Sequence, residues 1–271
     1  QSGNVPVIST KISGLGRFAL LEKVSAGKEL STTETAEWQR TTARLEKICI
    51  EAADNGISLF IDAEESWVQQ AIDQLAEEMM AQYNRQKVVV YNTFQLYRHD
   101  RLEYLRRSFA LAEEKGFLLG AKLVRGAYME KERDRAERMG YPSPIQPDKA
   151  ATDRDYDAAV RFCVERHEKI ALCLASHNAQ SNLLLTQEMQ TRGIAPQHPH
   201  CTFCQLYGMS DNITYNLSAA GYQASKYVPY GEVREVIPYL LRRAQENSSV
   251  GGEVSRELNL IRKEQARRKK K

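Results

Sequence analysis

The amino-acid sequence predicts an α/β fold, a (β/α)8 barrel of the TIM type, with the first strand of the barrel missing from the chain. Short apolar runs alternate with amphipathic stretches of helical period, which is the pattern of parallel βαβ units. The 271 residues, of which 42% are hydrophobic, suffice for one large core, and single barrels commonly have this length. Polar residues follow the apolar runs at their carboxyl ends, where barrel enzymes carry their active sites.

Seven apolar runs are expected to form strands separated by helices. So many consecutive units favour a closed barrel over an open sheet, although two domains would also fit the length. An eighth strand with its helix would have to precede Val5, and because the chain begins with Gln1 we expect a fragment or a numbering that omits upstream residues. In chain order the runs are Val5–Ile12, Ile57–Ile61, Lys87–Phe94, Leu119–Val124, Ile170–Ala175, Cys201–Leu206 and Gln223–Val228.

The distribution of charge separates the body of the chain from its end. We expect a barrel domain over residues 1–250 and a C-terminal helix with a basic tail over residues 251–271. Five consecutive basic residues, 267–271, account for more than the whole net charge of +3. A nucleic-acid-binding protein would spread basic residues over a face of its fold, so nucleic acid is not an expected partner. The tail is interpreted most simply as a frayed helix end, and alternatively as a contact for an anionic membrane surface.

Membrane spans, disulfides and metals are not expected. No apolar run approaches the ~18 residues of a membrane span, and no signal peptide opens the chain. Five cysteines, an odd number without a framework spacing, fit a reducing compartment. The segment His198–Cys204 contains one CxxC pair beside two histidines, which is a weak zinc signal because a second pair is lacking. We favour a loop leading into a strand that carries Cys204 inward.

A set of polar or small residues lies at the carboxyl ends of the predicted strands. Any one of them fits ordinary loop polarity, but the same placement at seven consecutive strands favours a shared site at the barrel mouth. In strand order they are Lys11; Asp62 and Glu64; Asn92 and Gln95; Arg125, Gly126, Ala127 and Tyr128; Ser176, His177 and Asn178; Gln205; and Tyr227.

A predicted helix after the last strand carries two adjacent arginines. Tyr239 precedes Arg242 and Arg243 by three and four residues. Glu246 follows the two arginines at the same spacings, so helical geometry directs all four side chains toward one face. Two guanidinium forks held by a carboxylate form a clamp for a carboxylate or phosphate. Taken alone, the segment also fits a solvated helix with an i,i+4 ion pair, which is worth a few tenths of a kcal/mol.

Most of these residues fall within six blocks that resemble the signature segments of the proline dehydrogenase family. The blocks appear in the family's order and cover nearly the whole chain, from Val5 to about Ser249. The resemblance is stronger to the single-function enzymes, including the mitochondrial ones, than to the bifunctional bacterial forms, which typically exchange the residue types at Lys122 and Arg125. The blocks are Phe60–Glu65, Lys122–Tyr128, Ala175–Asn178, Gln205–Met209, Lys226–Gly231 and Tyr239–Asn247.

The resemblance implies a flavoenzyme that binds FAD noncovalently at the C-terminal mouth of the barrel. It would oxidise L-proline to Δ1-pyrroline-5-carboxylate by hydride transfer from the ring carbon beside nitrogen to flavin N5, and pass the electrons to a membrane quinone. Such an enzyme would sit peripherally on the cytoplasmic face of a bacterial inner membrane or on the matrix side of the mitochondrial inner membrane. No GxGxxG follows a strand, so FAD is not expected in a Rossmann-type site.

The substrate residues that the resemblance implies fit the chemistry of proline, which offers a carboxylate and an apolar ring. Arg242 and Arg243 would bind the carboxylate. Lys11 would lie near the same site, with Asp62 pairing with it or holding a neighbouring arginine. Tyr227 favours proline, because hydroxyproline-oxidising relatives have a smaller serine that leaves space for the hydroxyl. The full set is Lys11, Asp62, Tyr128, Leu206, Tyr227, Tyr239, Arg242 and Arg243.

The cofactor residues that the resemblance implies come from several strand ends. Lys122 and Arg125 would lie near the flavin, where a positive charge stabilises the anionic reduced form. No general base is assigned, because water can accept the amine proton. The set comprises Asn92, Gln95 and Gln205 at the polar edge of the flavin; Lys122, Val124, Arg125, Gly126 and Ala127 on the fourth predicted strand and its loop; Thr152, Ser176, His177 and Asn178 along the ribityl, phosphate and adenosine part; and Glu246.

Several alternatives share the predicted fold. Another flavin-dependent barrel oxidoreductase, similar to methylenetetrahydrofolate reductase, or a hydroxyproline dehydrogenase would keep the cofactor and change the substrate. A Schiff-base lyase would use Lys122 or Lys226 as its amine. A non-catalytic regulator built on the same barrel would keep the pocket without a reaction.

Overall fold

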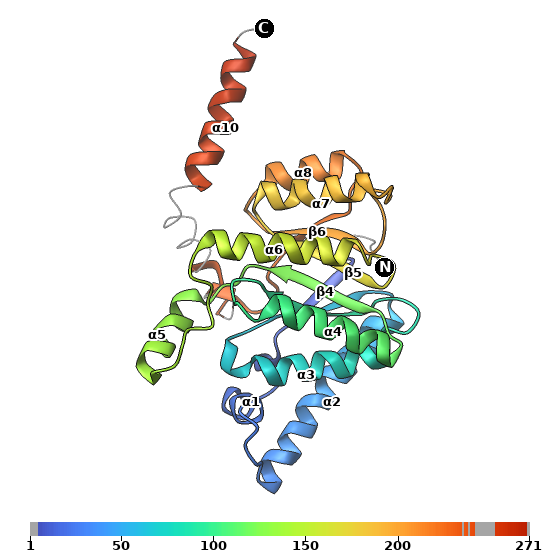
Figure 1. The fold of residues 1–271 in the computed structure, drawn as a ribbon, viewed down its shortest axis with the longest axis vertical. Coiled ribbons are helices and arrows are strands. Elements are labelled where there is room, and N and C mark those ends of the chain that lie inside the picture. Colours follow the sequence, from blue (N-terminus) through green and yellow to red (C-terminus); the bar gives the residue numbers. More distant parts are fainter. Residues whose placement is uncertain (1–4, 235, 238, 242–252, 270–271) are drawn as a thin grey trace. The chain divides into compact units, whose positions relative to one another are not determined.

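The computed structural model describes residues 5–234, 236–237, 239–241 and 253–269 (Figure 1). The chain divides into two compact units, Gln1–Lys226 and Tyr227–Lys271. The larger unit contains nearly the whole sheet and the helices that pack on it. Among the described residues, no helix is both long and apolar enough to cross a bilayer.

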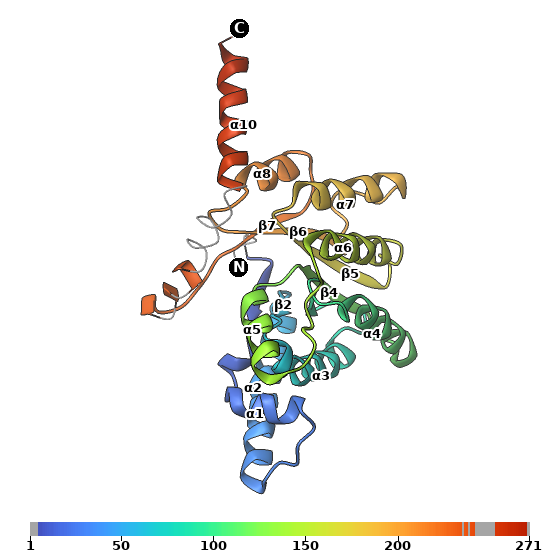
Figure 2. The same ribbon diagram turned by 60° about the vertical axis from the view of Figure 1, so that its left-hand side comes forward.

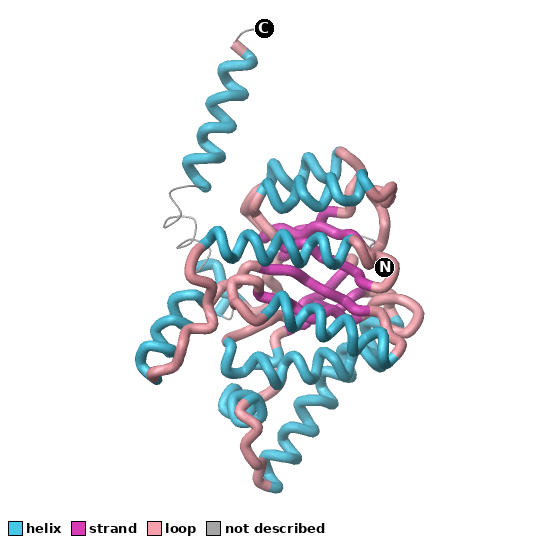
Figure 3. Tube along the Cα trace, in the orientation of Figure 1, coloured by secondary structure: helices cyan, strands magenta, loops and turns pink. Residues whose placement is uncertain are grey.

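Seven strands form one sheet whose spatial order follows the chain from β1 to β7. The pairs from β1 to β6 are parallel, as the alternation of strands and helices predicts. All seven predicted strands and the α/β class are confirmed, and the sheet curls as in a barrel of the TIM type (Figure 3). The strands are β1 (Val7–Thr10), β2 (Ser58–Ile61), β3 (Val90–Gln95), β4 (Leu119–Val124), β5 (Ile170–Ala175), β6 (Cys201–Leu206) and β7 (Ala224–Tyr227).

Most helices of the larger unit pack on one face of the sheet or on a helix that does so (Figures 1 and 2). A single 3-10 turn, η1 (Ile12–Gly14), follows β1. Near the C-terminus, α10 spans Glu253–Arg268. The helices of the larger unit are α1 (Phe18–Ser25), α2 (Thr32–Asp54), α3 (Ser66–Tyr83), α4 (Arg101–Lys115), α5 (Met129–Met139), α6 (Lys149–Val164), α7 (Ala179–Thr191) and α8 (Asp211–Ala219).

Strand alternation separates a hydrophobic core under the helices from a polar inner face. In β4, Leu119, Ala121 and Leu123 are fully buried and belong to the main hydrophobic cluster. Successive side chains of a strand point to opposite faces, so Lys122 lies on the inner face. Its strand neighbours there are Thr93 of β3 and Cys173 of β5. The inner face of the sheet therefore positions the polar residues considered for function.

The long helix α2 begins with a capping box. The Ser31 hydroxyl accepts a hydrogen bond from the Glu34 N–H at 3.3 Å, and the Glu34 carboxylate accepts one from the Ser31 N–H at 2.8 Å. The same carboxylate accepts a hydrogen bond from Lys23, and these bonds lower the pKa of Glu34 to about 2. Reciprocal capping satisfies two N–H groups that a helix start otherwise leaves open.

Replacing Ser31 with alanine is expected to lower the free energy of unfolding by ~1 kcal/mol, because it removes a side-chain acceptor from the start of α2. Urea denaturation at neutral pH measures this loss. Thr33→Ala, which changes an exposed residue of the first turn, is the matched control. Equal stability of the two variants would show that the cap contributes nothing measurable.

Candidate functional site

Lys11, after β1, meets Tyr128, at the start of α5. The Lys11 ammonium donates a hydrogen bond of 2.7 Å to the Tyr128 hydroxyl and lies 5.5 Å from the centre of its ring. Burial alone would lower the pKa of Lys11, but Tyr128 and the carboxylates of Glu64 and Asp62 raise it above its usual value. Lys11 is therefore a positive charge at neutral pH. The structure thus joins two residues predicted to contact the substrate that lie 117 positions apart.

Asp62, after β2, forms an ion pair with Lys122 on the inner face of β4. The ammonium and a carboxylate oxygen are 2.7 Å apart, and both side chains are largely buried. Burial alone would lower the pKa of Lys122, but attraction to Asp62 and the hydrogen bond with it raise the pKa above its usual value. From the sequence, Asp62 is expected to pair with Lys11 or to hold an arginine. The structure gives Asp62 a hydrogen bond from Lys122. The charge of Asp62 also helps to raise the pKa of Lys11.

The β2–α3 loop, residues 62–65, connects three separate segments through its acidic side chains. Glu64 accepts hydrogen bonds from the Ser13 N–H and hydroxyl at 2.9 and 2.5 Å, which ties the loop to η1. Glu65 forms an ion pair with Lys131 of α5. Sequence reasoning noted Glu64 only as a polar strand-end residue and missed Glu65, because their partners lie 51 and 66 positions away and form no local motif.

Arg125 links β4 to the start of α7. Its guanidinium donates to Asp153, to the Ser176 hydroxyl and to the Ser181 hydroxyl at 2.8, 2.9 and 3.1 Å. It also stacks on the ring of Tyr156, at 4.3 Å from the centre. A cation beside the positive N-terminal end of a helix attracts an anion, such as a pyrophosphate. This donor set fits the phosphate part of a dinucleotide.

Three more predicted cofactor residues lie beside Arg125. Asn178 caps α7 by accepting from the N–H groups of Gln180 and Ser181. His177 Nδ1 lies 3.0 Å from the Ser210 hydroxyl. Thr152, on α6 next to Asp153, is buried, and its hydroxyl donates to the Asp148 carbonyl at 3.2 Å. The residues predicted for the ribityl, phosphate and adenosine part therefore lie after the carboxyl ends of β4 and β5 and at the start of α6.

Gln95 is the predicted flavin residue with an open polar atom. It is 2% exposed, and its Oε1 has no hydrogen-bond partner among the described residues. Strand alternation places Gln95 on the same inner face as Thr93, which is the register partner of Lys122. Buried acceptors are almost always satisfied, so this oxygen marks a position for a donor from a bound molecule. It fits the polar edge of a flavin.

Asn92 and Gln205 point toward the helices. Asn92 donates to Asp73 of α3 at 2.9 Å, where Asp73 also receives two hydrogen bonds from the buried Arg101. Gln205 donates to the Ser176 carbonyl at 3.2 Å and accepts from Thr214 at 2.8 Å. The structure therefore does not bring these two amides to the inner face beside Gln95.

The loop after β4 passes closely over Tyr97. Gly126 has a φ of +141°, and a Cβ there would lie 2.4 Å from the Tyr97 ring, so only glycine fits. Its neighbours are accessible: Ala127 is exposed, Val124 is half-buried, and Leu206, at the end of β6, is also half-buried. These residues fit a wall that a ligand can reach.

Two thiols line the inner face next to Lys122. Cys173 of β5 and Cys204 of β6 are both buried, which confirms the expected inward position of Cys204. A hydrogen bond from the Cys173 thiol, helped by the charge of Lys122, lowers the pKa of Cys204 below its usual value. The described residues contain no group of three metal-ligating side chains arranged to hold an ion.

The remaining predicted substrate residues belong to the smaller unit. The rings of Tyr227 and Tyr239 stack there, with centres 6.1 Å apart and planes 25° apart. Arg242, Arg243 and Glu246 lie outside the residues that the structure describes.

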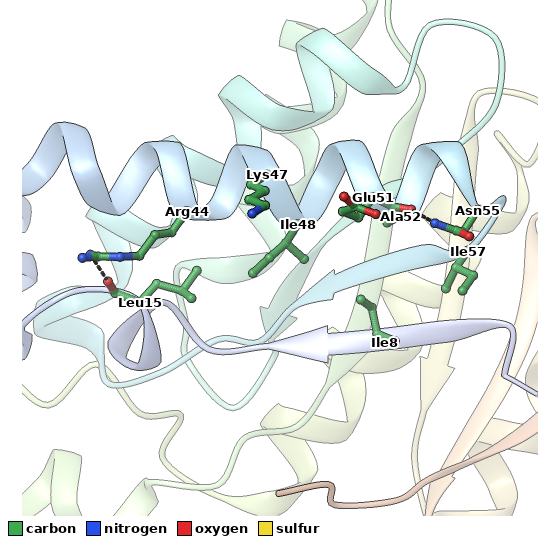
Figure 4. Close-up of a pocket in the computed structure, with 9 residues that line it drawn as sticks. All are labelled: Ile8, Leu15, Arg44, Lys47, Ile48, Glu51, Ala52, Asn55 and Ile57. Carbon is green, nitrogen blue, oxygen red and sulfur yellow. Dashed lines mark hydrogen bonds between the residues drawn. The ribbon is translucent and has the colours of Figure 1, made fainter.

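An apolar groove lies away from these residues, between α2 and β1 (Figure 4). Arg44 crosses one end and donates to the Leu15 carbonyl at 2.9 Å. The groove shares no residue with the predicted site. Its lining residues are Ile8, Leu15, Arg44, Lys47, Ile48, Glu51, Ala52, Asn55 and Ile57.

Comparisons with known proteins agree on one family. A family model described as proline dehydrogenase matches residues 2–256. Proline dehydrogenase 1, mitochondrial, of Drosophila melanogaster is 39% identical over 250 residues, which cover 89% of this chain and 37% of that protein. Hydroxyproline dehydrogenase of Xenopus laevis is 37% identical over 250 residues, which cover 91% of this chain and 54% of that protein. The chain spans about half or less of the length of these relatives.

Solved structures show the same fold. The crystal structure of proline utilization A (PutA) from Bdellovibrio bacteriovorus inactivated by N-propargylglycine matches with a TM-score of 0.78. The match covers 90% of this chain and 24% of that chain, at 24% sequence identity. It supports the barrel-like α/β architecture.

Proposed function

Because this chain belongs to the proline dehydrogenase family, we propose that it oxidises L-proline to Δ1-pyrroline-5-carboxylate with bound FAD. The observation that best supports a bound flavin is the Gln95 Oε1 atom. This acceptor is buried on the same inner face as Lys122 and has no hydrogen-bond partner among the described residues. When bound, FAD would supply the hydride acceptor, N5 of its ring. Electrons would then pass to a membrane quinone.

Different residues around the inner face would bind different parts of the cofactor. Gln95 accepts from the flavin edge, and Lys122 contributes positive charge near the ring. Arg125 and the start of α7 hold the pyrophosphate by charge and hydrogen bonds. We retain as further proposals Asn92, Val124, Gly126, Ala127, Thr152, Ser176, His177, Asn178, Gln205 and Glu246.

The substrate is recognised through its carboxylate and its ring. Arg242 and Arg243 bind the carboxylate, and Lys11 adds a charge that Tyr128 holds in place. Tyr128, Leu206, Tyr227 and Tyr239 wall the ring, and Asp62 keeps Lys122 charged. The amine of proline must lose a proton before or during hydride loss, and no side chain is assigned as the acceptor because water can take the proton.

Anaerobic addition of L-proline to the purified yellow protein tests the proposal. We expect the flavin absorption to bleach and one equivalent of Δ1-pyrroline-5-carboxylate to form per flavin. A yellow protein bleached only by hydroxyproline, or by neither compound, would reject proline as the substrate. A colourless protein trapped on a carbonyl substrate by borohydride would indicate a lyase instead.

Two lysines bear on the lyase alternative. Lys122 is 5% exposed and its pKa is raised by Asp62, so its amine is protonated and a poor nucleophile. Lys226 donates to the Met209 carbonyl and pairs with Asp211, at 2.6 and 2.7 Å. The Lys122 amine is held as a cation and the Lys226 amine is engaged by two oxygen partners, which favours the flavoenzyme.

The proposed location follows from the electron acceptor. A quinone is dissolved in a membrane, so the enzyme would contact the mitochondrial inner membrane or a bacterial inner membrane peripherally. The Drosophila relative is named mitochondrial. Sedimentation with anionic vesicles that contain a quinone tests the contact, and no binding at low salt would reject it.

A further inference from the structure

A fully buried carboxylate joins α5 to the start of α3. Glu132 is 0% exposed, and its two oxygens accept hydrogen bonds from the Ser66 N–H and the Ser66 hydroxyl, each at 2.6 Å. Ser66 is the first residue of α3, so the carboxylate also lies at the positive end of that helix. Charge-assisted bonds in a buried place are stronger than the same bonds in water.

Both ends of this connection lead to predicted site residues. The Glu132 N–H donates to the Tyr128 carbonyl at 2.9 Å, which makes Tyr128 and Glu132 the ends of the first turn of α5. The Tyr128 side chain then meets Lys11. On the other side, Ser66 directly follows the β2–α3 loop, which begins with Asp62. Glu132 therefore links the loop that carries Tyr128 to the loop that carries Asp62.

The neighbouring contacts between these helices are weaker candidates for the same role. Lys131 pairs with Glu65 and Arg135 with Glu22 of α1, but the Lys131 side chain is 58% exposed and that of Arg135 26%. Solvent-accessible ion pairs contribute little to stability. Removing a buried acceptor that binds two donors is costly, because both donors then lack a hydrogen-bond partner.

We propose that Glu132 is a positioning residue for substrate binding. By anchoring the first turn of α5 on α3, it holds Tyr128 against Lys11, so that the substrate meets a wall already in place. This inference rests on the proposed function. Preorganised contacts bind the substrate and the transition state alike, so their loss raises KM more than it lowers kcat.

Glu132→Gln tests the proposal, with Glu137→Gln as the matched control on an exposed face of the same helix. We expect the KM for L-proline to rise roughly tenfold, because a wall that is no longer held in place must be ordered when the substrate binds. The kcat should stay within about threefold of wild type, and the control should match wild type. An equal loss in kcat and kcat/KM, or an unchanged KM, would overturn the proposal.

A double-mutant cycle identifies the route of the effect. Tyr128→Phe removes the hydroxyl that Lys11 binds. If Glu132 acts through Tyr128, then Glu132→Gln should raise KM much less in the Tyr128→Phe background than in wild type. Full additivity of the two effects on KM would show that Glu132 does not act through this residue.

A fluorescence measurement reads the helix contact without turnover. Trp67 follows Ser66, and the guanidinium of Arg135 and the ammonium of Lys131 lie 4.3 and 5.7 Å from its ring. In a Trp38→Phe background, Glu132→Gln should change Trp67 emission, and Glu137→Gln should not. Ser66→Ala, which removes only the hydroxyl donor, gives the milder variant if Glu132→Gln unfolds the protein.

The two readouts separate the inference from the proposed function. A wild type that proline does not bleach would reject the function, while the Trp67 response would still report the anchor. A wild type that turns over proline, with normal KM in both Glu132→Gln and Ser66→Ala, would reject the inference alone. Unchanged Trp67 emission in both variants would also reject it.

Discussion

Replacing Asp62 with asparagine is expected to destabilise the protein by roughly 3–5 kcal/mol at neutral pH, the usual cost of removing one partner from a buried ion pair. The Lys122 ammonium, whose side chain is 7% exposed, would keep its charge and lose the carboxylate that lies 2.7 Å away. Denaturation in urea measures the loss. FAD occupancy should fall as well, because Lys122 lies on the face proposed for the flavin.

The pH dependence gives this prediction a distinctive sign. In wild type the pKa of Lys122 is raised by the ion pair. The contribution of this pair to the free energy of unfolding is therefore present below about pH 10.4 and is lost as the pH rises through the folded-state pKa. In Asp62→Asn, burial should lower that pKa, so the unfolded state binds more protons and stability should rise with pH. The difference in free energy of unfolding between wild type and Asp62→Asn should therefore become smaller from neutral pH to about pH 10.

The double variant Asp62→Asn with Lys122→Met is the control. It removes both charges, and buried pairs replaced by uncharged side chains often cost little. We expect it to be more stable than Asp62→Asn alone. A double variant as unstable as the sum of the single variants would show that the ion pair is not the cause.

Replacing Arg242 or Arg243 with methionine is expected to raise the KM for L-proline roughly a hundred-fold or more. A guanidinium fork on a desolvated carboxylate is worth about 2–5 kcal/mol when truncated, and each 1.4 kcal/mol is a factor of ten. The flavin colour should largely remain, because these side chains are assigned to the substrate. Steady-state kinetics and the absorption spectrum measure the two properties on one sample.

Arg242→Lys and Arg262→Met are the matched controls. Lysine keeps the charge and loses the fork, so it should fall between wild type and methionine. Arg262 is an exposed arginine of α10, and its replacement should leave KM unchanged. Loss of colour with a normal KM would mean that the arginine pair serves the cofactor instead.

The strands of the sheet were predictable because their signal is local. An apolar run such as Leu119–Val124 is visible in a window of a few residues. All seven predicted strands lie in the sheet in chain order. The residues after them were predictable for the same reason, since the end of a parallel strand is known once the strand is known. Lys11 and Tyr128 meet on this basis.

Side-chain partners were less predictable. Asp62 receives a hydrogen bond from Lys122, a partner that the sequence pattern did not indicate, because the inner face of β4 places Lys122 beside it. Asn92 faces a helix while Gln95 faces inward, a difference of strand parity that a motif does not state. Glu132 has no local signal, since its partner Ser66 lies 66 positions away.

The wide separation of these partners has a consequence for the order of assembly. The residues at the end of β2 find Lys122 and Glu132 only 60 and 66 positions later in the chain. A nascent chain that ends before β4 therefore carries Asp62 and Ser66 without these partners. Closing such long loops carries an entropic cost, so the contacts near Tyr128 form after the strands and helices that lead to them. The mouth of the barrel is thus among the last parts of this unit to mature.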